Sequence, residues 1–176
     1  MAIIPEVAQA LAAYRESGFF FIQAPLEEGG LGFPYTVAAA IGGLFSCANV
    51  ATNGYAFLTQ AAANLIRAVG SEDQKRRYLP ALVEGRWVGT MCLSEAQAGS
   101  SLADIRTSAE PLPDGRYALR GNKMWISSGD HEMAENIIHL VLAKAPGGGE
   151  GTKGISLFIV PKFLVNADGS LGTRNG

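Results

Sequence analysis

Two short stretches of the sequence combine small, hydroxyl-bearing and aromatic residues in an order that suits ligand binding. In MCLSEAQAGSS, residues 91–101, an apolar run leads into a turn of Ala, Gly and Ser. Such small side chains let a ligand lie close to backbone N–H groups. In KMWISS, residues 123–128, a large aromatic residue is followed by hydroxyls. An indole beside hydrogen-bond donors suits a flat ligand with one polar edge.

The donors of this candidate site come from the ends of two expected strands. The peptide N–H groups of Leu93 and Ser94, together with the Ser94 hydroxyl, are placed to bind a polar heterocycle. Trp125 is expected at the end of the second strand. The same pattern also fits a core tryptophan with solvated serines, and the residues alone leave both interpretations open. The ligand hypothesis requires Ser94 and Trp125 to lie beside one cleft.

Other catalytic patterns are missing from the sequence. Ser94, Asp130 and His131 could supply a nucleophilic triad, but no GxSxG elbow is present. No glycine-rich phosphate loop follows a strand and opens a helix. Cys47 and Cys92 lack the spacing of metal ligands, so we expect two buried thiols in a reducing compartment and no metal site.

The first half of the chain has the spacing of helices. Pro5 opens a predicted helix that ends near Ser17, and two Ala-rich helices are predicted over 35–50 and 52–69. Ser71 with Gln74 three residues later forms a capping box, which predicts a helix that runs to about Glu84.

The second half has the composition of strands. Pro113-Asp114-Gly115 is a hairpin turn, so the strands beside it should pair antiparallel. Helices followed by strands indicate an α+β fold with a boundary near Gly85. Residues 166–176 are polar and turn-rich, and no strand is predicted there. The expected strands lie within residues 86–95, 105–112, 116–127, 135–144 and 154–162.

Composition and charge limit the possible partners. The net charge of −2, with no basic cluster beyond residues 75–77, makes nucleic acid an unexpected partner. No Asp, Glu, Lys or Arg lies between Glu28 and Arg67, a length that could cross a bilayer. Pro34 and Asn49 are among the residues that interrupt this stretch, so we expect a pair of helices buried in a larger soluble assembly and no membrane span. Without a secretory signal pattern, the expected location is cytoplasmic.

The two stretches resemble the middle-domain motifs of the flavin-dependent acyl-CoA dehydrogenases. The family's Thr/Ser-Glu-Pro-x-Ala-Gly-Ser-Asp run is similar to residues 94–101, and its Gly-x-Lys-x-Trp-Ile-Thr/Ser run is similar to residues 121–127. Residues 25–32 and 70–80 also look like family motifs. The later segments 135–143 and 152–163 look like the branch that includes 3-methylmercaptopropionyl-CoA dehydrogenases.

The resemblance implies a fold and a reaction. It implies a helical N-terminal domain over residues 1–85 and an antiparallel β-barrel middle domain over residues 86–176 that is expected to be truncated at its C-terminal end. It also implies a C-terminal four-helix domain that this chain is expected to lack. The implied reaction is α,β-dehydrogenation of an acyl-CoA thioester, with FAD as cofactor and hydride transfer to flavin N5. The Glu base of the family comes from the C-terminal domain, so no catalytic residue is assigned and the chain is expected to be an inactive fragment.

The resemblance also implies which residues hold the flavin. Met91, Leu93 and Ser94 would line the isoalloxazine, with their donors near its N1/O2 edge. Donors there would stabilise the negative charge of reduced flavin. Gly99 and Ser100 would lie near the FAD phosphates and the CoA thioester arm, so Ser100 would also contact the substrate.

The remaining implied contacts come from the second stretch. Trp125, Ile126 and Ser127 would lie along the other side of the flavin. Two residues depart from the family motif, because Ala96 stands in place of Pro and Ser101 in place of Asp. The loop is therefore expected to be less rigid and to lack an acceptor that would hold the turn.

The implied partners are acyl-CoA, an electron-transfer flavoprotein or similar acceptor, and further copies of the full-length chain. The first alternative is a non-catalytic module that binds acyl-CoA or a partner subunit and has lost the flavin. A membrane-associated protein built on the uncharged segment between Glu28 and Arg67 is the second alternative.

Overall fold

The computed structural model describes residues 3–176, which form two compact units. The first unit runs to Thr90 and also contains Ser127–Ile138 and Pro161–Gly176. The second unit consists of Met91–Ile126 and His139–Val160. The candidate site residues therefore fall mainly in the second unit. The domain boundary near Gly85 remains a prediction.

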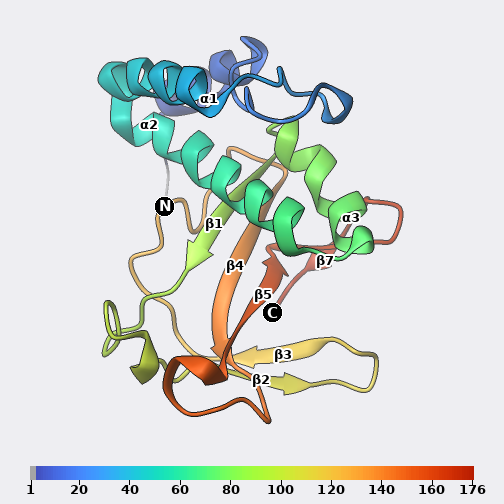
Figure 1. Ribbon diagram of the computed structural model, residues 1–176. Helices are drawn as coiled ribbons and strands as arrows, with labels where there is room; N and C mark the ends of the chain where they lie inside the picture. The colour runs from blue at the N-terminus through green and yellow to red at the C-terminus, as the bar shows by residue number, and fades with distance from the viewer. Residues whose placement is uncertain (1–2) are drawn as a thin grey trace. The chain divides into compact units, whose positions relative to one another are not determined.

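Three α-helices belong to the first unit, and their ends follow the predicted signals (Figure 1). Helix α1, Pro5–Glu16, begins with a proline, which loses no hydrogen bond at that position. Helix α3, Glu72–Val83, begins with the capping box: the Gln74 N–H donates to Ser71 Oγ at 3.2 Å, and the Ser71 N–H donates to Gln74 Oε1 at 2.9 Å. Both predicted helices are confirmed.

Helix α2, Tyr35–Val69, consists of two helical halves joined at a kink. Asn49 has non-helical dihedral angles, and its side-chain oxygen accepts a hydrogen bond of 2.9 Å from the Thr52 N–H. Asn49 thus caps the second half as an N-cap residue does. The Asn53 amide donates to Ser46 Oγ at 2.7 Å and so ties the second half to the first. The two predicted helices are confirmed, with their junction slightly earlier than expected.

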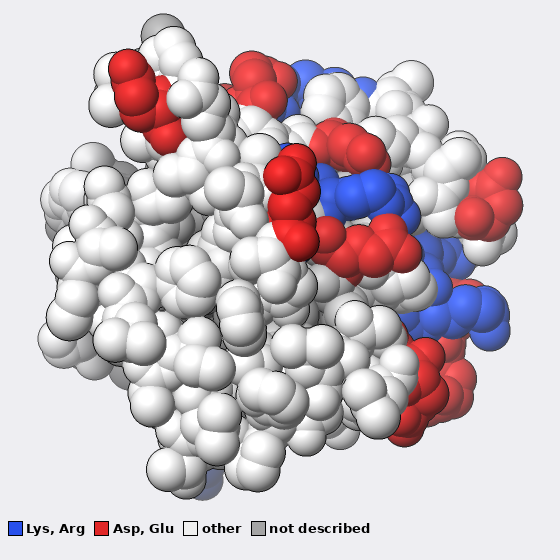
Figure 2. Space-filling view, turned by 90° about the horizontal axis from the view of Figure 1, so that it is seen from above, with Lys and Arg blue, Asp and Glu red and all other residues white. Residues whose placement is uncertain are grey.

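Much of α2 faces solvent. Leu44, Val50 and Phe57 are 72%, 72% and 66% exposed, and Figure 2 shows a broad area without charged side chains over this part of the unit. By length and composition, α2 is the one helix in residues 3–176 that could cross a membrane. Cys47 lies on the uncovered side of α2 and is exposed, so the prediction of a buried thiol is wrong there, whereas Cys92 is buried as predicted.

One buried cluster of the first unit lies where α1 and α2 meet. Leu11, Tyr14, Phe20 and Ala56 form a buried cluster, and the Tyr14 ring stacks on Phe45 with centroids 3.9 Å apart. Large aromatic surfaces thus pack between α1, α2 and the irregular segment after α1. This segment continues to the short 3₁₀ turn η1, Leu26–Glu28.

Strand β1, Trp87–Cys92, approaches α2 closely at Gly89. The Gly89 N–H donates to Thr59 Oγ1 at 3.1 Å. A Cβ atom at Gly89 would lie 2.5 Å from the Ala62 Cβ, so a glycine is required at this contact.

The strands do not close into a barrel. The main sheet has the order β1, β4 (Asn136–Lys144), β2 (Ser108–Pro111) and β3 (Tyr117–Arg120), and β5 (Ile155–Pro161) pairs with β4. The predicted α+β fold class is confirmed, while the expected antiparallel barrel is not closed within the described residues 3–176. The pairing of β2 with β4 is moreover parallel, while the antiparallel pairing of β2 with β3 across the Pro113 turn is confirmed.

A further pair of strands lies in the first unit. Strand β6, Phe163–Val165, pairs antiparallel with β7, Leu171–Arg174. The sequence analysis predicted no strand after residue 166. All four residues of β7 are exposed, so the strand lacks the alternation of apolar and polar residues that identifies a half-buried strand.

Candidate functional site

Residues 91–101 and residues 123–126 belong to the second unit, where the two candidate stretches meet. The Met124 N–H donates to the Ser94 carbonyl oxygen at 3.0 Å. The Lys123 ammonium donates to the Leu93 carbonyl oxygen, also at 3.0 Å. The two stretches therefore meet in the fold. The hollow at this place is lined by Met124 but by neither Ser94 nor Trp125, so a cleft shared by these two residues stays a prediction.

Trp125 lies in a loop and not at the end of a strand, which corrects the prediction. Strand β3 ends at Arg120, and residues 121–126 form no strand. A Cβ atom at Gly121 would lie 2.3 Å from Thr107 Oγ1. Gly121 thus lets the chain lie against Thr107. Three residues later, the Met124 N–H donates to the Ser94 carbonyl and not to a partner within a strand.

Ser94 and Trp125 present groups that suit a flat ligand. The Ser94 hydroxyl forms no hydrogen bond within residues 3–176 and is half-buried. The Trp125 side chain is 75% exposed, which excludes the interpretation as a core tryptophan. Its φ of 56° is rare for a bulky residue and marks a constrained backbone, a feature that concentrates at binding sites. A free hydroxyl donor and an exposed indole, carried by two segments that the Met124–Ser94 hydrogen bond joins, are groups that fit an aromatic heterocycle.

A buried carboxylate lies next to Ser94. The side chain of Glu95 is 4% exposed and accepts hydrogen bonds from five donors. We call this group of residues the Glu95 clamp. Its donors are the Lys123 ammonium at 2.8 Å, the Thr107 hydroxyl at 2.5 Å, the N–H groups of Thr107 and Arg106 at 3.0 and 2.7 Å, and the Gln97 amide at 2.7 Å.

These contacts keep Glu95 ionised. Burial by itself raises the pKa of the carboxyl, but the hydrogen bonds from Lys123, Thr107 and the Arg106 N–H outweigh burial. The net result is a pKa well below the usual value for glutamate. Glu95 is therefore a structural anion at neutral pH and not a free proton acceptor.

The loop after Glu95 is closed by contacts that replace the missing motif residues. The Glu95 N–H donates to the Ala98 carbonyl at 2.7 Å, and the Ala98 N–H donates back at 3.1 Å. The Ser101 hydroxyl donates to Asp104 Oδ2 at 2.7 Å. A carboxylate three residues further along, at the end of the 3₁₀ turn η2, Leu102–Asp104, thus supplies the acceptor that the sequence analysis expected to be lost.

The structure brings most of the predicted site residues into the second unit. Gly99 and Ser100 are exposed in the loop after the Glu95–Ala98 turn. Ser127 belongs to a segment of the first unit. The other predicted residues of the second unit are Met91, Leu93, Ser94, Trp125 and Ile126.

A small hollow of about 260 Å³ adjoins the Glu95 clamp. The only carboxylate in its lining is that of Glu95, whose oxygens are already hydrogen-bonded within the clamp. The hollow therefore offers no free general base. Its lining consists of Glu95, Ala96, Gln97, Arg106, Thr107, Gly121, Asn122 and Met124.

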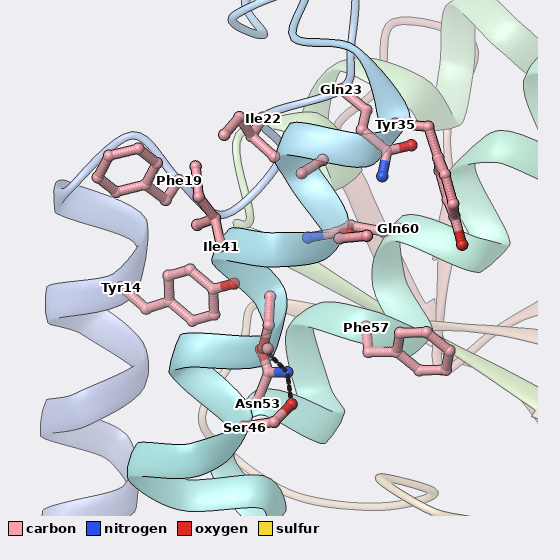
Figure 3. Close-up of a pocket in the computed structure, with 14 residues that line it drawn as sticks. Tyr14, Phe19, Ile22, Gln23, Tyr35, Ile41, Ser46, Asn53, Phe57 and Gln60 are labelled. Carbon is pink, nitrogen blue, oxygen red and sulfur yellow. Dashed lines mark hydrogen bonds between the residues drawn. The ribbon is translucent and has the colours of Figure 1, made fainter.

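A second hollow of about 270 Å³ lies in the first unit, between α1 and the halves of α2 (Figure 3). Its wall includes the rings of Tyr14, Phe19 and Phe57 and the amides of Asn53 and Gln60. None of its lining residues carries a carboxylate, an imidazole or an ammonium group. This hollow can hold an apolar group but supplies no acid–base chemistry at neutral pH.

A second buried ammonium lies in the first unit. Lys162 donates to the His131 carbonyl at 2.9 Å, to Asp130 Oδ1 at 2.8 Å and to Glu132 Oε1 at 2.9 Å. We call this group the Lys162 cluster. His131 Nδ1 accepts from the Met133 N–H at 3.1 Å, which leaves the proton on the other ring nitrogen of a neutral ring. Burial first, and then the charge of Lys162, lower the pKa of His131.

The roles of Glu95, Lys123 and Lys162 were not predicted from the sequence. A signal for two of them was present. Glu95 is the only charged residue in residues 91–101, and Lys123 is the only one in residues 121–128. One carboxylate and one ammonium in two otherwise uncharged stretches indicate a pair. Lys162 had no such signal.

Two family models match the chain. Residues 2–86 match the model described as acyl-CoA dehydrogenase, N-terminal domain, and residues 90–173 match the one described as acyl-CoA dehydrogenase, middle domain.

Individual relatives agree with these matches. The chain is 41% identical over 174 residues to 3-methylmercaptopropionyl-CoA dehydrogenase of Ruegeria pomeroyi, a match that covers 98% of this chain and 30% of that protein. An acyl-CoA dehydrogenase complexed with FAD from Bacillus anthracis has a TM-score of 0.75 at 30% identity, over 89% of this chain and 25% of that one. A structure titled as electron transferring flavoprotein of Acidaminococcus fermentans has a TM-score of 0.74 at 26% identity. This match covers 93% of this chain and 44% of that one. The chain thus spans about a third of the length of the curated relative.

Proposed function

Because the chain belongs to the acyl-CoA dehydrogenase family, we propose that it forms the flavin- and thioester-binding part of an FAD-dependent acyl-CoA dehydrogenase. The observation that carries this proposal is that a free Ser94 hydroxyl and an exposed Trp125 indole belong to two segments joined by the Met124–Ser94 hydrogen bond. The similarity to the FAD-complexed dehydrogenase supports the choice of FAD.

The proposed reaction is α,β-dehydrogenation of an acyl-CoA thioester. When bound, FAD supplies the acceptor at N5 for the hydride from the β carbon. We assign no catalytic base within residues 3–176, since Glu95, the carboxylate of the site, is held as an anion by its five donors. The base that removes the α proton is proposed to come from outside this part of the enzyme.

The residues of the chain have proposed roles in binding and orientation. The Ser94 hydroxyl donates toward the N1/O2 edge of the flavin, where reduction places negative charge, and such a fixed donor stabilises that charge. The Trp125 indole covers one side of the ring system. Gly99 and Ser100, exposed after the Glu95–Ala98 turn, are proposed to approach the phosphates and the thioester arm.

The finer partners remain proposals. The name of the Ruegeria relative supports a short acyl thioester such as 3-methylmercaptopropionyl-CoA as substrate. The similarity to the Acidaminococcus structure supports an electron-transfer flavoprotein as the acceptor. A homo-oligomer and a cytoplasmic location are proposed for the full-length enzyme, and sedimentation without detergent tests whether α2 associates with membranes.

A flavin titration tests the proposed function. The purified chain, titrated with FAD, is expected to quench flavin fluorescence and to retain a yellow flavin spectrum after gel filtration. Ser94→Ala should weaken binding by about 1 kcal/mol, the value of one hydrogen bond. Ser156→Ala, which removes an exposed hydroxyl from β5 in the same unit, should leave binding unchanged. A chain that binds acyl-CoA but stays colourless with FAD would overturn the proposal in favour of a module without flavin.

A further inference from the structure

On the premise of the proposed flavin site, we infer that Glu95 is a positioning residue: its buried ion pair with Lys123 holds the two flavin-facing segments together and keeps the charge beside the flavin balanced. Glu95 does not touch the flavin in this inference. It acts through Ser94, its neighbour in the chain, and through Lys123, which lies two residues before Trp125.

The geometry supports this role because one ammonium bridges the two segments. Lys123 Nζ donates both to the Glu95 carboxylate, at 2.8 Å, and to the Leu93 carbonyl, at 3.0 Å. These two acceptors flank Ser94 on either side. The Met124 N–H then bonds to Ser94 itself at 3.0 Å. The segment that carries the hydroxyl is thus fixed at three consecutive residues by the segment that carries the indole.

The carboxylate also anchors a third segment. The N–H groups of Arg106 and Thr107 and the Thr107 hydroxyl donate to Glu95. Thr107 is buried and lies against Gly121, at the start of the loop that leads to Trp125. Glu95 therefore holds the beginning of this loop through Thr107, which lies against Gly121. It holds the middle of the loop by its own ion pair with Lys123.

The pair is also electrically balanced, and this balance gives a specific test. The side chains of Lys123 and Glu95 are 11% and 4% exposed, so little water screens either charge. Glu95→Gln would leave an unbalanced ammonium, which favours the negative charge that reduction places on the flavin. Lys123→Met would leave an unbalanced carboxylate, which disfavours that charge. A loss of packing alone would not move the flavin midpoint potential in opposite directions.

The experiment compares four variants of the 176-residue chain for FAD affinity and flavin midpoint potential. Glu95→Gln and Lys123→Met are each expected to weaken FAD binding about tenfold or more, and to raise and lower the midpoint potential, respectively. The double variant, which is neutral again, should return the potential toward that of the parent. Glu110→Gln is the matched control, since it removes an exposed carboxylate paired with Arg120 in the same unit, and it should change neither quantity.

Three results would overturn the inference. The first is a parent-like affinity in Glu95→Gln, and the second is a potential that shifts in the same direction in both single variants. The third comes from amide hydrogen exchange without flavin. Glu95→Gln should accelerate exchange in both residues 93–98 and residues 121–126, and exchange rates equal to those of the parent would contradict the role of Glu95 in holding these segments. Because the exchange measurement needs no flavin, it tests the positioning role of Glu95 separately from the proposed function. A parent chain that binds no FAD refutes the proposed function alone. If Glu95→Gln fails to fold, the neutral double variant supplies the affinity and exchange measurements.

Discussion

The Glu95 clamp and the Lys162 cluster each contain a lysine side chain with little exposure, 11% for Lys123 and 6% for Lys162, but they differ in where the carboxylates lie. In the clamp the carboxylate itself is buried, 4% exposed. In the Lys162 cluster the ammonium is 6% exposed, while the carboxylates of Asp130 and Glu132 are 66% and 85% exposed.

The difference determines how much each charge depends on its partners. A carboxylate taken out of water needs several donors to compensate its lost hydration, and Glu95 has five. Asp130 and Glu132 keep most of their hydration and so gain little from Lys162. We therefore expect the Glu95 carboxylate to be required for stability, whereas the carboxylates of the Lys162 cluster can be replaced with little loss of stability.

The largest expected effect on the free energy of unfolding is that of Glu95→Ala. This change leaves the Lys123 ammonium and the N–H groups of Arg106 and Thr107 without their acceptor, and breaking a buried ion pair in this way costs about 3–5 kcal/mol. Urea unfolding measures the loss of stability. Glu110→Ala, at the exposed pair with Arg120, should cost no more than about 1 kcal/mol. Equal losses in the two variants would contradict the comparison.

Lys162→Met is expected to have an intermediate effect. The exposed carboxylates of Asp130 and Glu132 can be hydrated in place of the ammonium, but the His131 carbonyl loses its ammonium donor. An unsatisfied buried acceptor costs about 1–3 kcal/mol. The same urea measurement applies, with amide exchange in 127–138 as the local readout. A loss larger than that of Glu95→Ala would reverse the proposed order of the two lysine groups.

The smallest effect at neutral pH is expected for Glu132→Gln, with Asp130→Asn as its matched partner. Each should lower stability by about 0–1 kcal/mol, because exposed ion pairs contribute little. Added salt should reduce even this difference, since it screens exposed charges. A salt-independent loss above that range would show that these carboxylates are not replaceable.

Acid pH should separate the two groups without any mutation. The pKa of His131 is lowered in the folded chain, so the neutral ring stabilises the fold above about pH 6.5 and this contribution is lost as the pH falls below that value. The pKa of Glu95 is also lowered, so its contribution is complete above about pH 4.3 and is lost only below that value. Stability should thus decline first through His131, and His131→Gln should remove the decline between about pH 6.5 and 5. Amide exchange should locate this first loss in residues 127–138.

Local sequence signals predicted local structure well. The Ser71 capping box set the start of α3, Pro5 set the start of α1, and the Pro113 turn set the antiparallel pairing of β2 with β3. Strand β7 had no such signal, since all of its residues are exposed and only pairing with β6 makes it a strand. The exposure of Cys47 was likewise not readable from its apolar neighbours, because burial depends on what covers α2.

The sequence by itself determined the family, the helix and hairpin signals, and the two stretches that carry the candidate site. These depend on residue types and on spacings within about a dozen residues. Only the tertiary structure decided that Glu95 and Lys123 form a buried pair, that Trp125 is exposed in a loop, and that the sheet stays open. The physical reason is that burial, charge pairing and strand closure depend on contacts between residues far apart in the chain, such as the Lys123–Glu95 and Met124–Ser94 bonds.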